Sequence, residues 1–338
     1  MPAPSRPIVS PLTIEEISQR IEKLRPEKDS HIANQHVVSR AILRKFSTKI
    51  KSQINLIKFN LRYSNFSLKG TQGCGRVRDY ARFASASLER KWNLIENRIS
   101  PSLKSIEEGS ALSSAATLAD LREIVVLHYV RSKRTYEIHQ RSRLKHLGHA
   151  AELYGEALQH PEELFRMFYK RFGFYAAGPE AIFKMLDQMI YSQTPDLESG
   201  AVFRVMVEDH YDKVRSIVED WGVQILYASD GELLIGDNPA LSIRRSEDPA
   251  SPPMQVPIGE AEIVFMPISP KHLLCLGGQT ESGDLDANSI FESNQLQLLY
   301  AHSEAYFRPE SGLEDFALRF CQHTARSPEF QQGAHRDS

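Results

Sequence analysis

Five polar residues spread along the chain could together carry out acid–base chemistry: His36, Glu96, Arg131, Asp237 and Asn238. A histidine and a carboxylate can move protons, and an arginine can stabilise negative charge that develops on a phosphate during its transfer. Such a set would suffice to cleave a phosphodiester bond, although the same groups also serve other reactions. These residues can act jointly only if the fold brings them together.

Two glutamates occur in a segment whose apolar residues recur at helical spacing. Glu89 and Glu96 are seven residues apart, so they project from the same face of the predicted helix. Trp92 borders that face, and a glutamate buried beside it would need a cationic or hydrogen-bonding partner. The alternative is a solvated helix edge with Arg90 and Arg98 nearby.

His128 and Arg131 lie one turn apart in the most apolar helical segment of the sequence. An arginine there requires a carboxylate or an anionic ligand, because arginine is almost never fully buried without a partner. A buried Arg–Glu pair that holds two helices in register is the structural alternative. Arg134 and His139 also fit the R-x-x-x-x-H pattern of HEPN-type ribonucleases, a pattern that recurs a few residues later.

Asp237 and Asn238 follow a predicted strand in the sequence Gly-Asp-Asn-Pro. They could cap their own backbone as Asx turns, or be held rigidly in an active site. The sequence contains no H-E-x-x-H motif, Cys/His cluster or EF-hand loop, so it predicts no zinc or calcium site. If a divalent ion is used, we expect Mg²⁺ on Glu96 or Asp237, because Mg²⁺ needs only one or two protein carboxylates.

The two parts of the chain carry opposite charge. Residues 1–150 contain 27 Lys and Arg against 13 Asp and Glu, residues 151–338 contain 14 against 30, and the whole chain has a net charge of −2. A surface formed by the basic residues of 40–98 would suit a nucleic acid or a nucleotide. The alternatives are that the two parts attract each other, or that the charges are scattered over unrelated surfaces.

The composition is that of an ordinary soluble globular protein. The chain has 338 residues, of which 41% are hydrophobic and 25% charged, and its mean hydropathy is −0.38. These values exclude collagen-like, disulfide-scaffold and wholly disordered proteins. No signal peptide is visible and no run of ~18 apolar residues occurs, so we expect no membrane partner. The three widely separated cysteines indicate a reducing, cytoplasmic environment.

The hydrophobic periodicity predicts an α+β fold, with a mainly helical body and a small, largely antiparallel sheet from the C-terminal third. Along the chain, a helix is expected over 35–46, a hairpin or two short strands over 54–68, and a long helix from 117 past 136. The expected organisation is an N-terminal tail and helix over 1–30, one α+β domain over 31–310 and a tail over 311–338. That domain would comprise a helical body over 80–220, a sheet region over 221–280 and a closing helix over 289–306.

Several short motifs in this order resemble a bacterial family known as domain of unknown function 4238. The resemblance covers roughly residues 30–310. The matching positions are His36, Leu43 and Phe46, then Glu96, then His128 and Arg131, then Gly236-Asp237-Asn238-Pro239, then Pro267-Ile268-Ser269-Pro270, and finally Asn294 and Ala301. The chain departs from the family pattern at Ser39, where the family has proline, and at Gly236, where it has Ser or Thr.

The resemblance implies a fold group and a single cluster formed by His36, Glu96, Arg131, Asp237 and Asn238, with Glu89 and His128 as secondary members. It implies no reaction. Together with the basic part of the chain, the cluster predicts a nuclease, such as an RNA-cleaving toxin or a phage-defence effector. The alternative is a non-enzymatic binding or regulatory protein whose polar cluster is structural. Substrate and oligomeric state stay open at this point.

Overall fold

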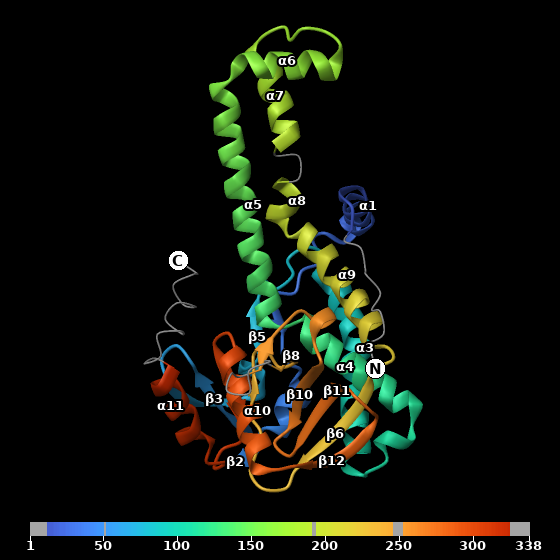
Figure 1. Cartoon of the computed structure of the whole chain (residues 1–338), viewed down its shortest axis with the longest axis vertical. Helices are drawn as coiled ribbons and strands as arrows, with labels where there is room; N and C mark the ends of the chain where they lie inside the picture. The colour runs from blue at the N-terminus through green and yellow to red at the C-terminus, as the bar shows by residue number, and fades with distance from the viewer. Residues whose placement is uncertain (1–11, 51, 191–193, 246–252, 325–338) are drawn as a thin grey trace.

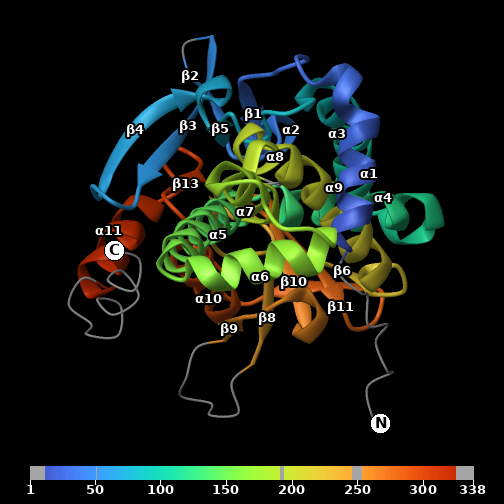
Figure 2. The same cartoon turned by 90° about the horizontal axis from the view of Figure 1, so that it is seen from above.

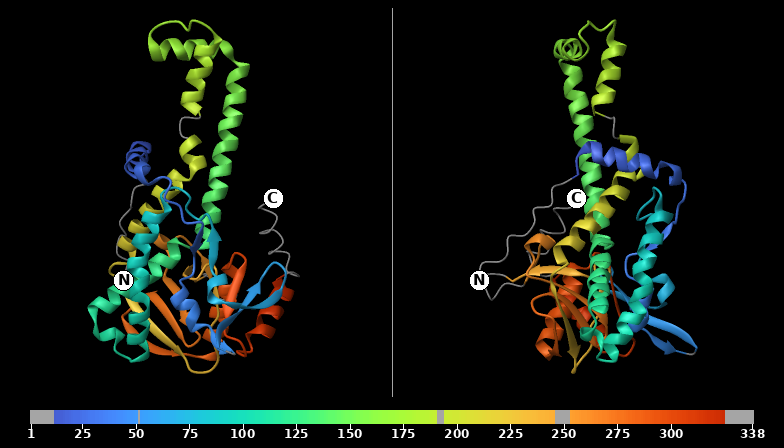
Figure 3. Two further views of the ribbon diagram at one scale, coloured as in Figure 1. Left: turned by 180° about the vertical axis from the view of Figure 1, so that it is seen from behind. Right: turned by 90° about the vertical axis from the view of Figure 1, so that its right-hand side faces the viewer.

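Helices and strands occur along the whole length of the computed structural model, which describes residues 12–50, 52–190, 194–245 and 253–324. A mixed body carries the sheets, and a long helical arm projects from it (Figures 1 and 3). The predicted α+β class is confirmed. Within the described part of the chain, no helix is both long and apolar enough to cross a membrane.

The largest sheet has six strands in the order β12-β6-β11-β10-β8-β9. All its neighbouring pairs are antiparallel except β12 and β6, which are parallel. The strands are β6 (Gly222–Ala228), β8 (Leu241–Arg244), β9 (Met254–Gln255), β10 (Ile263–Ser269), β11 (His272–Gly277) and β12 (Glu281–Leu285).

Side chains of this sheet enter two different apolar cores because successive residues of a strand point to opposite faces. Val264 and Leu274 pack with the helices α3 (Ser85–Glu107), α4 (Ala115–Val130) and α9 (Ala201–Val218). Phe265 and Leu273, which adjoin Val264 and Leu274 in the sequence, pack against α10 (Ala287–Tyr300) on the other face. Helix α4 is apolar on nearly every side, as expected for a helix in the centre of the body.

Strands from both ends of the chain form a second sheet, in the order β2-β3-β13-β7 with β4 also paired to β3. They are β2 (Thr48–Ile50), β3 (Gln53–Asn60), β4 (Asn65–Gly70), β7 (Ile235–Gly236) and β13 (Glu304–Phe307). A separate two-stranded sheet joins β1 (Asn34–His36) and β5 (Arg76–Arg78). The prediction of one small sheet from the C-terminal third was incomplete. The strands expected over 54–68 are β3 and β4, and β3 also pairs with β13 from the other end of the chain.

Shorter helices surround this body. Helix α1 (Ile14–Leu24) begins with the capping box predicted from Thr13 and Glu16. Helix α2 (Arg40–Lys45) packs beside α3, and α11 (Leu313–Thr324) lies near the β3–β4 hairpin at one edge of the body (Figure 2).

The arm consists of α5 (Lys133–Gln159), α6 (Pro161–Phe172), α7 (Pro179–Ile190) and α8 (Thr194–Ser199), and α9 returns from it to the body (Figure 1). Local sequence defines α6: Pro161 stands at its first position, and Gly173 ends it with φ of 76°. A small apolar cluster that includes Leu164, Phe168 and Met185 holds the tip together.

Several predicted helices differ from those observed. The segment expected to be a helix over 35–46 contains β1 and then α2. The long helix expected from 117 past 136 ends at Val130, and α5 begins at Lys133. The expected closing helix over 289–306 is α10 followed by strand β13, and part of the expected tail over 311–338 is α11. At β1 and β13, pairing with the distant strands β5 and β3 outweighs local helical preference.

Candidate functional site

The candidate site is built on an ion pair between the partly buried Glu96 on α3 and the buried Arg131 at the end of α4. Arg131 Nη2 donates to Glu96 Oε1 and, at 3.0 Å, to Ser39 Oγ, which itself donates to Glu96 Oε1 at 2.6 Å. The guanidinium carbon of Arg131 lies 5.1 Å from the centre of the Trp92 ring. Arg131 is fully buried, so these contacts compensate a charge that would otherwise be strongly unfavourable.

His128 supports this pair from one turn earlier on α4. Its Nδ1 donates to the Ile124 carbonyl at 2.7 Å, and its Nε2 accepts the Ser39 backbone N–H at 3.1 Å. Both ring nitrogens are thus occupied in the neutral form. Burial, followed by the charge of Arg131, lowers the pKa of His128 to about 4. His128 therefore positions Ser39.

Burial alone would raise the pKa of Glu96, but Arg131 and Ser39 outweigh it and lower this pKa to about 2. Glu89, two turns earlier on α3, has the opposite shift: burial raises its pKa, and Arg131 and Gln35 only partly oppose this. Gln35 Nε2 donates to Glu89 Oε1 at 3.1 Å. The two glutamates that share a helix face thus differ because Arg131 bonds directly to only one of them.

A hollow of about 340 Å³ opens beside the ion pair, between α2, α3 and β1. We call it the α2–α3 hollow. Its lining includes His36, Ser39, Arg40, Arg44, Glu96 and Ser100. His36 Nε2 accepts a hydrogen bond from Arg76 Nε at 3.1 Å. Burial, then the charges of Arg76 and Arg131, lower the pKa of His36 to about 4, so its ring is neutral at pH 7.

The α2–α3 hollow has an excess of positive charge. Arg40 and Arg44 line it, and no ion pair joins either of them to a carboxylate in the part of the chain that the structure describes. Arg40 Nε is buried with no hydrogen-bond partner among those residues. Of the described lining residues, only Glu96 carries a carboxylate, and Arg131 already neutralises it. The hollow is therefore suited to an anion.

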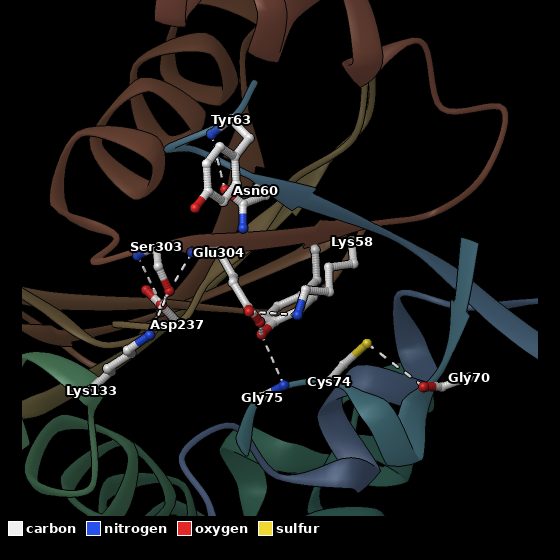
Figure 4. A network of polar contacts seen from close by, with 11 residues as sticks. Lys58, Asn60, Tyr63, Gly70, Cys74, Gly75, Lys133, Asp237, Ser303 and Glu304 are labelled. Carbon is white, nitrogen blue, oxygen red and sulfur yellow. Dashed lines mark hydrogen bonds and ion pairs between the residues drawn. The ribbon is translucent and has the colours of Figure 1, made fainter. Parts of the chain in front are cut away.

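Asp237 lies in a different network, shown in Figure 4. Its carboxylate accepts the backbone N–H groups of His302, Ser303 and Glu304 at 2.7–3.1 Å and the Ser303 hydroxyl at 2.8 Å. Lys133 Nζ is 4.0 Å away. Burial raises the pKa of Asp237, while Lys133 and these hydrogen bonds oppose the rise. Asp237 thus anchors the start of β13.

Asn238 likewise makes no hydrogen bond to the Glu96–Arg131 pair among the residues that the structure describes. Its Nδ2 donates to the Tyr300 carbonyl at 3.1 Å, and the residue lines a second hollow at the base of the arm. The structure therefore brings together Glu96, His128 and Arg131, with His36 on the same hollow. The two members of the predicted cluster at the β7 end, Asp237 and Asn238, have their contacts elsewhere.

Sequence reasoning missed several residues that organise the site. Ser39 links Glu96, His128 and Arg131, and the only sequence signal for it was its place before a short helix. Gln35 is buried and bonds both Glu89 and the Ala81 backbone. Across the described residues, no group of three or more His, Cys, Asp or Glu side chains is arranged to hold a metal ion.

A protein-family model matches the part of the chain that contains these residues. The model of the family described as protein of unknown function DUF4238 matches residues 34–311, which include every residue of the α2–α3 hollow and of the Asp237 network. No curated protein and no solved structure matches the chain significantly. Because the family model covers most of the sequence, the chain belongs to the DUF4238 family of proteins of unknown function.

Proposed function

We propose that this protein binds nucleic acid at the α2–α3 hollow and cleaves its phosphodiester backbone there. The observation that supports this proposal is the juxtaposition of a neutral His36 with Arg40 and Arg44, which lack carboxylate partners within the described chain. One arginine can donate two parallel hydrogen bonds to two oxygens of a phosphate, and its guanidinium stays charged at any physiological pH. The Glu96–Arg131 pair would hold the wall of the hollow rigid.

In this mechanism Arg40 and Arg44 bind the phosphate, and Arg76 turns from His36 towards it. His36 Nε2 then accepts the proton of the attacking hydroxyl or water as the new P–O bond forms. The imidazolium returns that proton to the oxygen that leaves as the old P–O bond breaks. A positioned general base of this kind contributes about 10²–10⁴-fold to a rate.

Cleavage of labelled single-stranded RNA and of duplex DNA by the full chain tests the proposal. The variant His36→Ala should lose at least ~10²-fold of the activity, with little change in melting temperature because His36 is only partly buried. His31→Ala is the matched control, since His31 is an exposed histidine that pairs with Asp79. Absence of cleavage by the parent protein, or equal activity in both variants, would contradict the proposal.

A second candidate function is that of a non-enzymatic binding or regulatory protein. It is favoured by the complete burial of Arg131 and His128, whose contacts join α2, α3 and α4. In that case Glu96→Gln, which leaves the Arg131 charge buried without a counterion, should cost about 3–5 kcal/mol of stability. The parent protein would cleave neither nucleic acid. The toxin and phage-defence roles depend on cleavage and remain predictions.

A further inference from the structure

Helices α5 and α9 meet the body at the base of the arm (Figures 1 and 3). Residues of both helices line a second hollow there. We call it the arm-base hollow. Its volume is about 390 Å³, and its lining comes from α4, α5, α9, the loop after β7 and the segment from β9 to Pro257. Small-molecule sites typically span about 300–1,000 Å³ and are mostly apolar with a few polar groups. No lining residue is shared with the α2–α3 hollow.

Flat rings form two walls of the arm-base hollow. The His139 ring packs on Phe203 with 4.4 Å between centroids. The rings of Tyr129 and His210 stack at 5.9 Å with an angle of 20° between their planes. Ile138, with 55% of its side chain exposed, lies in the lining where it meets solvent. Aromatic walls of this kind favour a planar ring as ligand.

Among the described residues that line the arm-base hollow, Arg134 alone is charged at neutral pH. Burial, and then the charge of Arg143, lower the pKa of His139 to about 4. Burial likewise lowers the pKa of His210, partly opposed by Asp209. Both histidines are therefore neutral, and the lining contains no Asp or Glu among the residues described.

The Arg134 guanidinium has no counterion in the described chain. It is partly buried, and its Nη1 donates to the side-chain oxygen of Gln255. Burial lowers its pKa, but arginine stays protonated in proteins. An arginine removed from water normally has a carboxylate or phosphate partner. The arm-base hollow thus combines a positive charge that lacks an anion with walls suited to a flat ring.

Asn238 adds a fixed polar group. It is almost fully buried, and its Nδ2 is bound to the Tyr300 carbonyl at 3.1 Å. Its Oδ1 receives no hydrogen bond from the residues that the structure places, so it is available to a donor on a ligand.

We propose that the arm-base hollow binds a small organic anion that carries a planar ring, with its anionic group on Arg134 and its ring against the aromatic walls. A carboxylate and a phosphate both pair with a guanidinium through two hydrogen bonds, so both belong to this class. The site is distinct from the nucleic-acid site proposed above and does not depend on it.

Isothermal titration of the full chain with two anions tests this inference. The probes are indole-3-acetate, a carboxylate, and adenosine 5′-monophosphate, a phosphate, each compared with its uncharged counterpart, indole-3-ethanol or adenosine. We expect at least one anion to bind more tightly than its counterpart, and Arg134→Gln to weaken that anion at least ~10-fold, the scale of a charged hydrogen bond. Arg215→Gln, an exposed arginine elsewhere on α9, should leave binding unchanged.

A second variant locates the site independently of the charge. Ile138→Trp would fill the hollow from its exposed side, and should abolish binding without lowering the melting temperature. This variant also tests whether the anion binds in the arm-base hollow if Arg134→Gln fails to fold. The inference is wrong if neither anion binds, if Ile138→Trp leaves the affinity unchanged, or if charged and uncharged probes bind equally well.

Discussion

At the scale of single residues, identical side chains have different roles because their partners differ. Glu96 is ionised well below neutral pH since it bonds Arg131 and Ser39, whereas burial raises the pKa of Glu89 on the same helix. His36 lines a hollow, while His128 has both ring nitrogens bonded within the protein. The residue type alone therefore does not identify which histidine could exchange a proton with a ligand.

His128 makes a specific prediction about acid stability. Its pKa is about 4 in the folded protein and about 6.5 in an unfolded chain, so between these values the unfolded chain binds more protons. The free energy of unfolding should then fall as the pH drops from about 6.5 to 4, by up to about 1.4 kcal/mol per pH unit from this residue. Glu89 and Asp237, whose pKa values are raised, act in the opposite direction.

Denaturant titrations at several pH values between about 4 and 6.5 measure how steeply the free energy of unfolding depends on pH. The variant His128→Asn removes the titrating ring and should flatten the slope relative to the parent protein, even though it lowers overall stability. His146→Ala, which changes an exposed histidine on the arm, is the control and should retain the parent slope. Equal slopes for His128→Asn and the parent protein would show that His128 does not titrate in this way.

At the scale of elements, helix α10 supplies hydrogen bonds to strand β7 in addition to those from its partner strand β13. Strand β7 has only two residues, and side-chain amides of α10 bond the strand and the residues on either side of it. Gln297 accepts the Gly236 N–H at 2.8 Å and donates to the Pro239 carbonyl at 3.0 Å. A Cβ on Gly236 would lie 3.0 Å from both the Ala301 Cβ and the Gln297 carbonyl oxygen, so this close approach favours glycine.

Removing this amide should weaken the β7 segment. Gln297→Ala leaves a buried N–H and a buried carbonyl without partners, which costs roughly 1–3 kcal/mol for each group. Gln295→Ala is the matched control, because Gln295 is on the same helix and only partly buried. Chemical denaturation measures both variants. If both variants lose a similar, small amount of unfolding free energy, the β7 segment is held by its pairing with β13 alone.

At the scale of the whole molecule, the charge asymmetry has two components. Some basic residues of the first part pair with acids of the second, as in Lys58–Glu304 at 2.5 Å and the contact of Lys91 with Glu208. Arg40 and Arg44 have no such partner in the described chain. Ion pairs between the two parts of the chain therefore account for some of the charge asymmetry. They do not account for the positive charge of Arg40 and Arg44 in the α2–α3 hollow.

If that remaining charge binds nucleic acid, affinity for duplex DNA should fall steeply between about 50 and 200 mM salt, with a slope near −0.9 per phosphate contacted. Arg44→Gln should weaken binding and reduce the slope by about one contact. Arg90→Gln, an exposed arginine paired with Glu27, should change little. Fluorescence anisotropy measures all three proteins. Undetectable binding at the lowest salt, or a flat salt dependence, would leave internal complementarity as the whole explanation.

Local sequence determined the elements whose stability comes from their own residues. The capping box at Thr13 and Glu16 begins α1, and the apolar spacing of Leu88, Trp92 and Ile95 produces α3. The 54–68 hairpin likewise followed from neighbouring residues, because its strands are adjacent in the chain. Such patterns can be predicted because helix and hairpin contacts join residues that are close in sequence.

Only the tertiary structure decided which polar residues meet. Ser39 reaches Glu96 across 57 positions and Arg131 across 92, and Asp237 bonds the backbone of residues 302–304 rather than either of them. No periodicity encodes these pairings, because each depends on how helices and strands from distant segments pack against one another. The sequence thus identified the residues able to do chemistry, while packing gave the Asp237 carboxylate partners outside the α2–α3 hollow.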